Sequence, residues 1–154
     1  MIIFVNSTKI AIMLRNRLMD NNIEAGLVHG KMNNIDRENV LKEFRLAKIK
    51  TLITTDIMCR GIDVDDLRIV INYDIAHDTD TYIHRVGRSG RYGSEGIAIN
   101  FCTYDDMHRI RLMERCYDIH IQDMPPLESV NKFLTGMSIP EGKINSSKMY
   151  NFDE

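Results

Sequence analysis

Residues 2–18, IIFVNSTKIAIMLRNRL, join a short apolar run to a stretch with helical periodicity. The run from Ile2 to Val5 consists of β-branched and aromatic side chains, which are typical of a buried strand. Apolar residues then recur at helical spacing, at Ile10, Met13, Leu14 and Leu18. Ser7, directly before this stretch, supplies the hydroxyl oxygen that suits a helix N-cap. The segment therefore predicts a buried strand followed by an amphipathic helix.

The same order of strand and helix recurs further along the chain. Ala25 to Val28 is followed by a turn at His29-Gly30 and by a helix that we expect from about Asn33. Its inward-facing residues are predicted to be Ile35, Val40, Leu41 and Phe44. Further strands are predicted at 51–54, 68–73 and 97–102, and further helices at 79–86 and 104–117. Apolar strands separated by helices predict an α/β fold, a single domain whose parallel sheet is sandwiched between helices.

Composition limits the classes of protein to which the chain can belong. Its 154 residues, 44% hydrophobic and 27% charged, suffice for one ordinary core. The net charge of −2 and the pI near 6.2 argue against binding of nucleic acid through a general basic field. The three cysteines form no C-x-x-C pair, so we predict neither a disulfide framework nor a metal site. Without a membrane-length apolar run or a signal-peptide pattern, we expect a cytoplasmic or nuclear protein with no membrane partner.

Both ends of the chain bear on its boundaries. A buried-strand run begins at Ile2, so we expect the chain to be a fragment of a longer protein. Beyond Leu134 glycine, serine and proline replace the apolar periodicity, and residues 135–154 are predicted to form a flexible tail. A docking segment and a vector remnant are alternative interpretations of this tail. The folded domain is accordingly expected to span residues 1–134.

A segment rich in arginine and glycine carries the strongest functional signal. Residues 84–91 read HRVGRSGR, with Arg85, Arg88 and Arg91 at every third position. We see no packing role for its two glycines, which end the predicted helix and open space for a ligand. Guanidinium groups keep their charge and can each bind two oxygens, so the pattern indicates a polyphosphate site. A solvated basic loop is the alternative.

A second polar segment, residues 54–63 (TTDIMCRGID), follows a predicted buried strand. In parallel sheets ligands collect at the carboxyl ends of the strands. Thr55 and Asp56 can form hydrogen bonds with a backbone phosphate or a sugar hydroxyl. Gly61 permits close approach, and Asp63 could accept from a ribose hydroxyl. The alternative is an Asx-capped loop closed by an ion pair between its arginine and its last aspartate.

Taken together, the two segments resemble motifs of the DEAD-box ATP-dependent RNA helicases. Residues 84–91 match motif VI of that family at each defining position, and residues 56–61 resemble motif V. Residues 3–7 resemble motif IV, and residues 34–37 lie where the family has Q-x-x-R. The resemblance covers residues 2–134 and is greatest to the translation-initiation and messenger-RNA-export helicases. It implies the second, C-terminal RecA-like domain of such a helicase.

The resemblance also implies roles for individual residues. Arg88 and Arg91 would be catalytic arginine fingers in RNA-stimulated ATP hydrolysis and local duplex unwinding. RNA, single-stranded or duplex, would bind without sequence preference. The implied roles are nucleotide binding (Gly61, Asp63 and Tyr92 beside the two fingers), RNA binding (Asn6, Ser7, Gly30, Arg37, Thr55 and Asp56) and contacts between motifs (Arg60, His84 and Arg85).

Departures from the family pattern limit what carries over. Cys59 stands where alanine is usual, and Asn34 replaces the glutamine of Q-x-x-R, so only Arg37 of that motif carries over intact. The chain has neither a G-x-x-x-x-G-K-[ST] loop nor a D-E-A-D run. The resemblance therefore implies that a separate N-terminal RecA-like domain holds Mg²⁺ and cradles the ATP phosphates, and that this chain alone is inactive.

Two other hypotheses remain open from the sequence. The domain could be a protein-interaction module whose acidic helix faces dock a regulator of helicase closure. It could also be a small RNA-binding protein, although this would leave Asp63 and Arg91 without a function.

Overall fold

The computed structural model describes residues 1–56, 67–89 and 96–136. The chain divides into two compact units, Met1–Ile119 and His120–Glu154. The residues with predicted roles that lie outside the described part are Arg60, Gly61, Asp63, Arg91 and Tyr92, together with Gly90 and most of the predicted tail.

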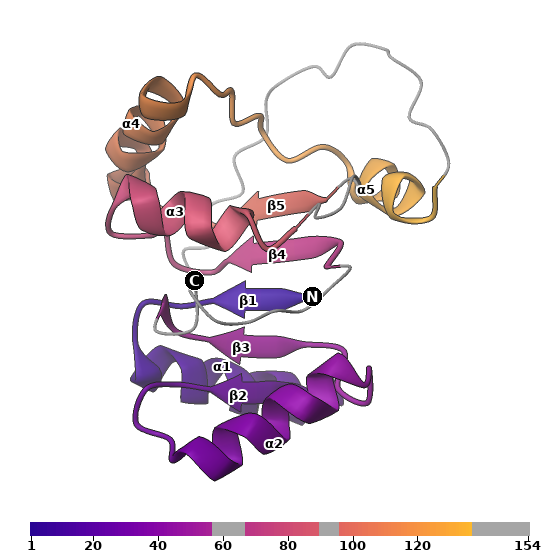
Figure 1. The fold of residues 1–154 in the computed structure, drawn as a ribbon. Coiled ribbons are helices and arrows are strands. Elements are labelled where there is room, and N and C mark those ends of the chain that lie inside the picture. Colours follow the sequence, from indigo (N-terminus) through magenta and orange to yellow (C-terminus); the bar gives the residue numbers. More distant parts are fainter. Residues whose placement is uncertain (57–66, 90–95, 137–154) are drawn as a thin grey trace. The chain divides into compact units, whose positions relative to one another are not determined.

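Five strands of the described residues form one sheet in the first unit. They are β1 (Ile2–Phe4), β2 (Gly26–Val28), β3 (Leu52–Thr54), β4 (Ile69–Asn72) and β5 (Ile97–Asn100). The strands pair in the order β2-β3-β1-β4-β5, and every pair is parallel (Figure 1). Each strand that the apolar runs predicted is present, in a slightly shorter form. The predicted α/β fold with a parallel sheet is confirmed.

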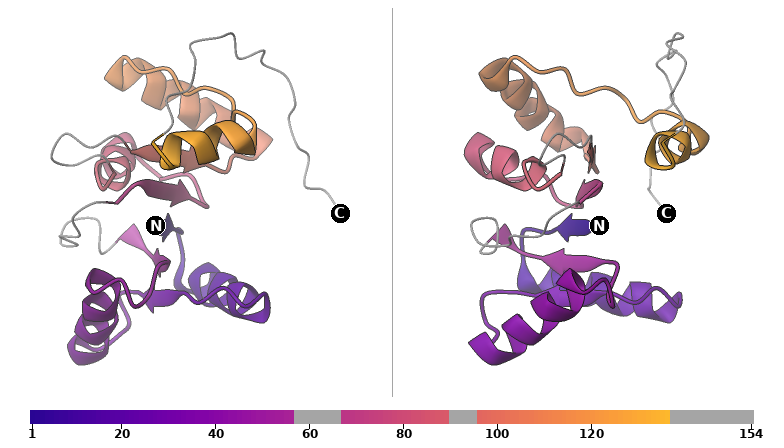
Figure 2. Two further views of the ribbon diagram at one scale, coloured as in Figure 1. Left: turned by 90° about the vertical axis from the view of Figure 1, so that its right-hand side faces the viewer. Right: turned by 45° about the vertical axis from the view of Figure 1, so that its right-hand side comes forward.

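Helices cover both faces of this sheet. They are α1 (Thr8–Asp20), α2 (Asn34–Arg45), α3 (Thr79–Val86) and α4 (Met107–Tyr117), the last preceded by the 3-10 turn η3 (Tyr104–Asp106). Viewed from its side, the sheet has α1 on one face and α2 and α3 on the other (Figure 2). The face shared by α2 and α3 is the one on which the polar residues described below gather.

Two apolar clusters follow from the alternation of side chains along the strands. The cluster on the α2 face contains Ile2, Phe4, Val28, Leu41, Phe44, Leu52, Leu67 and Val70. The cluster on the α1 face contains Ile3, Val5, Ala11, Leu14, Ala25 and Ile53. Strand β1 contributes to both clusters because it lies at the centre of the sheet, which explains why residues 2–5 are apolar without interruption.

Side-chain caps start the helices that follow β1, β2 and β4. The capping residues are Ser7, Asn33 and Asp78, and each accepts a hydrogen bond from the backbone N–H three residues later. These bonds satisfy N–H groups that have no partner within the helix. The predicted cap at Ser7 is confirmed.

Two predicted core positions are wrong. Met13 is 42% exposed, because Ala11 and not Met13 joins Leu14 on the buried side of α1. Ile35 is 75% exposed in the first turn of α2, while Leu41 and Phe44 further along the helix are buried as expected. Both errors concern the rotation of a helix about its axis, which apolar spacing alone leaves ambiguous when several apolar residues are adjacent.

The second unit contains helix α5 (Leu127–Leu134), which the sequence patterns did not predict. Pro126 precedes its first turn, a position at which the fixed φ angle of proline is compatible with a helix start. Within the described residues no helix is long and apolar enough to span a membrane.

Candidate functional site

The carboxyl ends of the three central strands bring polar residues together. Asn6 follows β1, Asp56 follows β3 and Asp74 follows β4. Because β1 lies between β3 and β4 in a parallel sheet, all three residues lie at the same end of the sheet. We call this end, where the carboxyl ends of the strands lie, the carboxyl edge. This is the edge at which α/β proteins bind ligands.

Arg85, from α3, lies at the centre of this edge and is fully buried. Its Nε and one Nη donate to the two carboxylate oxygens of Asp56, at 2.5 and 2.8 Å. Such a two-point pair fixes the orientation of both side chains. The pair joins residues that are 29 positions apart in the sequence.

The remaining donors of Arg85 are also engaged. They reach the side-chain oxygen of Asn6 at 2.7 Å, the backbone carbonyl of Asp74 at 2.7 Å and, less closely, the side-chain oxygen of Asn72 at 3.4 Å. The guanidinium carbon lies 5.4 Å from the centre of the Phe4 ring, within the range of a cation–π contact. A buried charge is tolerated only when it is paired and hydrogen-bonded in this way. We call Arg85, Asn6, Asp56, Asn72 and Asp74 the arginine hub.

The hub uses several residues for which the sequence predicted other roles. The side-chain NH₂ of Asn6 donates to the carbonyl of Ile75 at 2.9 Å, and its backbone N–H donates to the Asp74 carboxylate at 2.8 Å. Ser7 caps α1, as described above. Arg85 thus bonds residues of two other motif-like segments, Asn6 and Asp56. Its predicted linking role and the RNA contacts predicted for Asn6, Ser7 and Asp56 stay predictions.

Arg88 lies one helical turn beyond Arg85. It is half-buried, and its Nε donates to the backbone carbonyl of His84 at 3.2 Å. Gly87, between the two arginines, ends α3, and a Cβ atom there would lie 3.0 Å from the carbonyl oxygen of Ile83. This tight contact is with a carbonyl of its own helix, and no other described residue beyond its chain neighbours lies within 4 Å of such a Cβ, so the expectation that Gly87 has no packing role stays a prediction.

The imidazole of His84 is exposed and forms no hydrogen bond with another residue of the described part. Its predicted role as a link between motifs stays a prediction.

The other half of the edge, formed by β2 and β3, holds buried polar atoms of a different kind. Thr55 is buried, and its hydroxyl has no hydrogen-bond partner among the described residues. The Nε of Arg37, in α2 just after the loop that contains Gly30, is likewise buried without a described partner. One Nη of Arg37 donates to the carbonyl of Met32 at 3.2 Å, which holds the side chain against this loop. We call Thr55 and Arg37 the open half of the edge, since each has a buried polar atom without a hydrogen-bond partner among the described residues.

Sequence reasoning assigned no role to three polar residues that contact or support the hub. Asn72 is fully buried at the end of β4, and its side-chain NH₂ donates to the Asn100 oxygen at 2.8 Å. The Asn100 NH₂ in turn donates to the Tyr82 hydroxyl at 3.2 Å. Residues 71–74 and 82–85 also resemble the helicase family, but this resemblance gave Asn72 and Tyr82 no role. An asparagine at the end of an apolar strand, as in Ile69-Val70-Ile71-Asn72, is the signal that could have indicated one.

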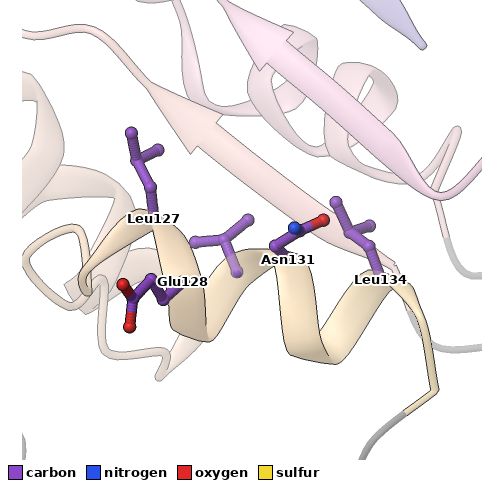
Figure 3. Close-up of a pocket in the computed structure, with 5 residues that line it drawn as sticks. Leu127, Glu128, Asn131 and Leu134 are labelled. Carbon is purple, nitrogen blue, oxygen red and sulfur yellow. The ribbon is translucent and has the colours of Figure 1, made fainter.

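A shallow groove of about 410 Å³ lies elsewhere, on the second unit (Figure 3). Its lining residues all come from α5 and are Leu127, Glu128, Val130, Asn131 and Leu134. The groove is an open side of one helix and contains no residue of the arginine hub. Among residues 1–56, 67–89 and 96–136, no group of three or more His, Cys, Asp or Glu side chains could hold a metal ion.

Comparisons with known proteins agree with this geometry. Residues 1–93 match the family model of the helicase conserved C-terminal domain. The chain is 44% identical over 124 residues to the ATP-dependent RNA helicase FAL1 of Yarrowia lipolytica, covering 80% of this chain and 31% of the relative. Eukaryotic initiation factor 4A of Dictyostelium discoideum gives the same identity and coverage. The chain thus spans about a third of the length of these curated relatives.

A solved structure has the same fold. S. cerevisiae Dbp5 bound to RNA and ADP BeF₃ matches with a TM-score of 0.82 and 32% identity, over 88% of this chain and 37% of the Dbp5 chain. The sheet order, the helices on both faces and the motif-bearing strand ends agree with that likeness. The chain therefore belongs to the helicase C-terminal domain family, as a RecA-like domain of the DEAD-box RNA helicases.

Proposed function

We propose that this chain is the C-terminal half of an ATP-dependent RNA helicase that acts in the cytoplasm or nucleus, and that it works together with an N-terminal RecA-like domain. The observation that carries the proposal is the arginine hub, which fixes α3 at the carboxyl edge of the sheet through a buried guanidinium. The next turn of the same segment carries Arg88. Because the hub holds α3 rigidly, it would also fix the position of Arg88, which in this proposal must contact a charged group on another domain.

In this proposal Arg88 and Arg91 are arginine fingers. Their positive charges stabilise the negative charge that develops on the transferred phosphoryl group of ATP. Gly61, Asp63 and Tyr92 contact the ribose and the rest of the nucleotide. The hub itself does not touch ATP, because the donors of Arg85 are engaged within the domain.

Mg²⁺ belongs to the other domain in this proposal. The described residues of this chain offer no cluster of acidic or imidazole groups suited to a metal ion. The chain also lacks the P-loop and the D-E-A-D sequence. For the same reason we propose that the isolated chain does not hydrolyse ATP.

We propose that RNA binds across the open half of the edge and the adjacent strand ends. The unpaired hydroxyl of Thr55 and the unpaired Nε of Arg37 support this, because a phosphate oxygen or a 2′-hydroxyl would complete their hydrogen bonds. Gly30 is exposed on the loop between β2 and α2, and in this proposal it contacts the RNA backbone. Contacts of this kind read no base, so binding would be sequence-tolerant and would weaken with added salt.

The test is RNA-stimulated ATP hydrolysis by a protein that joins this chain to an N-terminal RecA-like domain. We expect Arg88→Ala and Arg91→Ala each to lower kcat by roughly 10³- to 10⁵-fold, the range typical of arginine fingers. The control is Arg115→Ala, which removes an exposed arginine of α4. Turnover that survives both finger substitutions, with RNA binding and folding intact, would remove the catalytic role.

A regulatory function is the second candidate. The solved structures that match this chain include the S. cerevisiae Dbp5 C-terminal domain bound to Gle1 and IP6, and E. coli SrmB bound to the regulator RraA. These complexes favour protein regulators as further partners of this domain. We propose such docking as an addition to the helicase function. If the protein kept full ATPase activity without all three motif VI arginines, the docking of regulators would be its main function.

A further inference from the structure

Three polar side chains form a continuous relay between the sheet and α3. Asn72 and Asn100 end the neighbouring strands β4 and β5 and are paired in register. Their side chains are bonded at 2.8 Å, and Asn100 donates to the hydroxyl of Tyr82 at 3.2 Å. Tyr82 is buried on α3, three residues before Arg85. The relay therefore begins at Arg85 and returns to the same helix one turn earlier.

The hydrogen bonds of the relay have one consistent direction. The oxygen of Asn72 faces Arg85, which can only donate, so the NH₂ of Asn72 must point away from the arginine. The oxygen of Asn100 accepts from that NH₂, and this leaves the NH₂ of Asn100 for Tyr82. Reversing either amide would place donor against donor. Asn100 thus holds the orientation that Asn72 presents to the hub.

The relay connects α3 and β5, the two elements between which the chain passes through Arg88 and the end of the arginine-rich segment 84–91. Helix α3 ends at Val86, directly before Gly87 and Arg88, and β5 begins at Ile97. Arg85 and Tyr82 lie on α3, and Asn100 lies on β5. A shift of β5 relative to α3 would break the bond between Asn100 and Tyr82 or the bond between Asn100 and Asn72.

Stability alone does not account for these residues. Apolar side chains of similar shape can replace a buried set of hydrogen-bonded groups with little or no loss of stability. Burial raises the pKa of the Tyr82 hydroxyl, so this group keeps its proton at neutral pH and can act as donor or acceptor. A directional set of bonds adds what apolar packing lacks, a single allowed placement of α3 on the sheet.

We propose that Asn100 is a positioning residue for ATP hydrolysis, which acts through Asn72 and Tyr82 to set the placement of α3 and of Arg88 at its end. This inference rests on the proposed helicase function. It extends that function to a residue outside the helicase motifs that we recognised in the sequence. In this proposal Asn100 itself contacts neither ATP nor RNA, because both ends of its side chain are bonded within the domain.

The chemistry of the relay supplies a conservative variant for the test. In Asn100→Asp the carboxylate can accept from the NH₂ of Asn72, and it can also accept from the hydroxyl of Tyr82, which then reverses its role. Both bonds survive. In Asn100→Leu neither bond can form, although a side chain of similar size remains.

The experiment measures kcat and KM for RNA-stimulated ATP hydrolysis in the two-domain protein. We expect Asn100→Leu to lower kcat by about 10- to 100-fold, the scale of a small misplacement of a catalytic group, with KM for ATP nearly unchanged. The melting temperature should fall by a few degrees, because the buried NH₂ of Asn72 loses its acceptor, so kcat is measured well below it. Asn100→Asp should restore kcat to within about 3-fold of wild type, because the same placement is kept. Asn16→Leu, an exposed asparagine of α1, is the matched control.

A double-mutant cycle with Arg88→Ala separates positioning from other causes. If Asn100 acts through Arg88, Asn100→Leu should have no further effect on kcat once Arg88 is alanine. An equal loss in both backgrounds, or no loss in the wild-type background, would overturn the inference. If Arg88→Ala alone leaves kcat unchanged, the proposed function fails first and the inference fails with it.

Discussion

The two halves of the carboxyl edge are built from similar side chains and differ in whether those side chains are satisfied. In the arginine hub, the guanidinium of Arg85 has acceptors from three strand ends and from Asn72. In the open half, the hydroxyl of Thr55 and the Nε of Arg37 are buried without a described partner. Buried polar atoms cost free energy when they are left unpaired. The hub is therefore suited to stabilise the fold, and the open half is suited to bind a ligand.

Removing the arginine of the hub should produce the largest loss of stability. Arg85→Met keeps packing against Phe4 but leaves Asp56, Asn6 and the Asp74 carbonyl without their donor. We expect the free energy of unfolding to fall by about 3–5 kcal/mol, as for other broken buried ion pairs. Urea unfolding of this chain, followed by circular dichroism, measures the change.

A surface ion pair supplies the control for this substitution. Arg45 pairs with Glu38 at 2.8 Å, with side chains that are 39% and 65% exposed. Arg45→Met should change the free energy of unfolding by less than about 1 kcal/mol. Similar losses for Arg85→Met and Arg45→Met would show that the hub is not the structural centre we infer. Arg85→Lys, which keeps the charge but not the two-point geometry, should lie between the two.

Two adjacent threonines test whether the open half is poised for a ligand. Thr54 donates its hydroxyl to the carbonyl of Thr55 at 3.2 Å, whereas the hydroxyl of Thr55 has no described partner. Thr54→Val should therefore destabilise the domain by about 1 kcal/mol, while Thr55→Val should leave its stability unchanged or slightly higher.

RNA binding should respond in the opposite order. Loss of one hydrogen bond to RNA should weaken the affinity of the two-domain protein for a single strand by roughly 5- to 10-fold in Thr55→Val. Thr54→Val should have little effect. Fluorescence anisotropy with a labelled oligonucleotide at fixed salt measures both variants. Equal affinities for Thr55→Val and wild type would assign the unpaired hydroxyl to something other than RNA.

The sequence predicted the strands more reliably than the helix faces. Each strand is a continuous apolar run, because β1 and its neighbours are covered on both sides, and such runs are easily recognised. Met13 and Ile35 were misplaced because the rotation of a helix depends on what it packs against. Helix α5 was missed because it follows a segment without clear periodicity.

The site was predicted as a set of residues but not as a set of contacts. The sequence indicated Asn6, Asp56 and Arg85 as functional, but nothing in it shows that Asn6 and Arg85, 79 positions apart, are bonded. The relay from Asn72 to Asn100 spans 28 positions and requires the register of β4 and β5. Contacts of this range depend on strand order, which a pattern of apolar residues does not specify.

The smallest predicted effect concerns the start of the helix that carries the hub. Asp78 caps α3, and the hydrogen bond from the backbone N–H of Thr81 lowers the pKa of its carboxyl group. Asp78→Ala should reduce the free energy of unfolding by about 1 kcal/mol at neutral pH. Because the folded-state pKa is depressed, this contribution is present above the ordinary aspartate pKa and is lost as the pH falls through the folded-state pKa.

Asp78→Asn separates the cap from its charge. The amide oxygen still accepts from Thr81 but does not titrate, so this variant should keep most of the stability and lose the pH dependence that Asp78 contributes in acid. The measurement is urea unfolding of wild type and both variants at pH 7 and at a pH well below 3.8, where the carboxyl group of Asp78 is protonated in the folded state as well. If the difference between wild type and Asp78→Ala stays constant over that interval, the carboxylate does not supply the cap. The placement of α3 would then depend on the hub and the relay alone. The stability difference between wild type and Asp78→Ala therefore measures how much the N-cap adds to the buried contacts that hold α3.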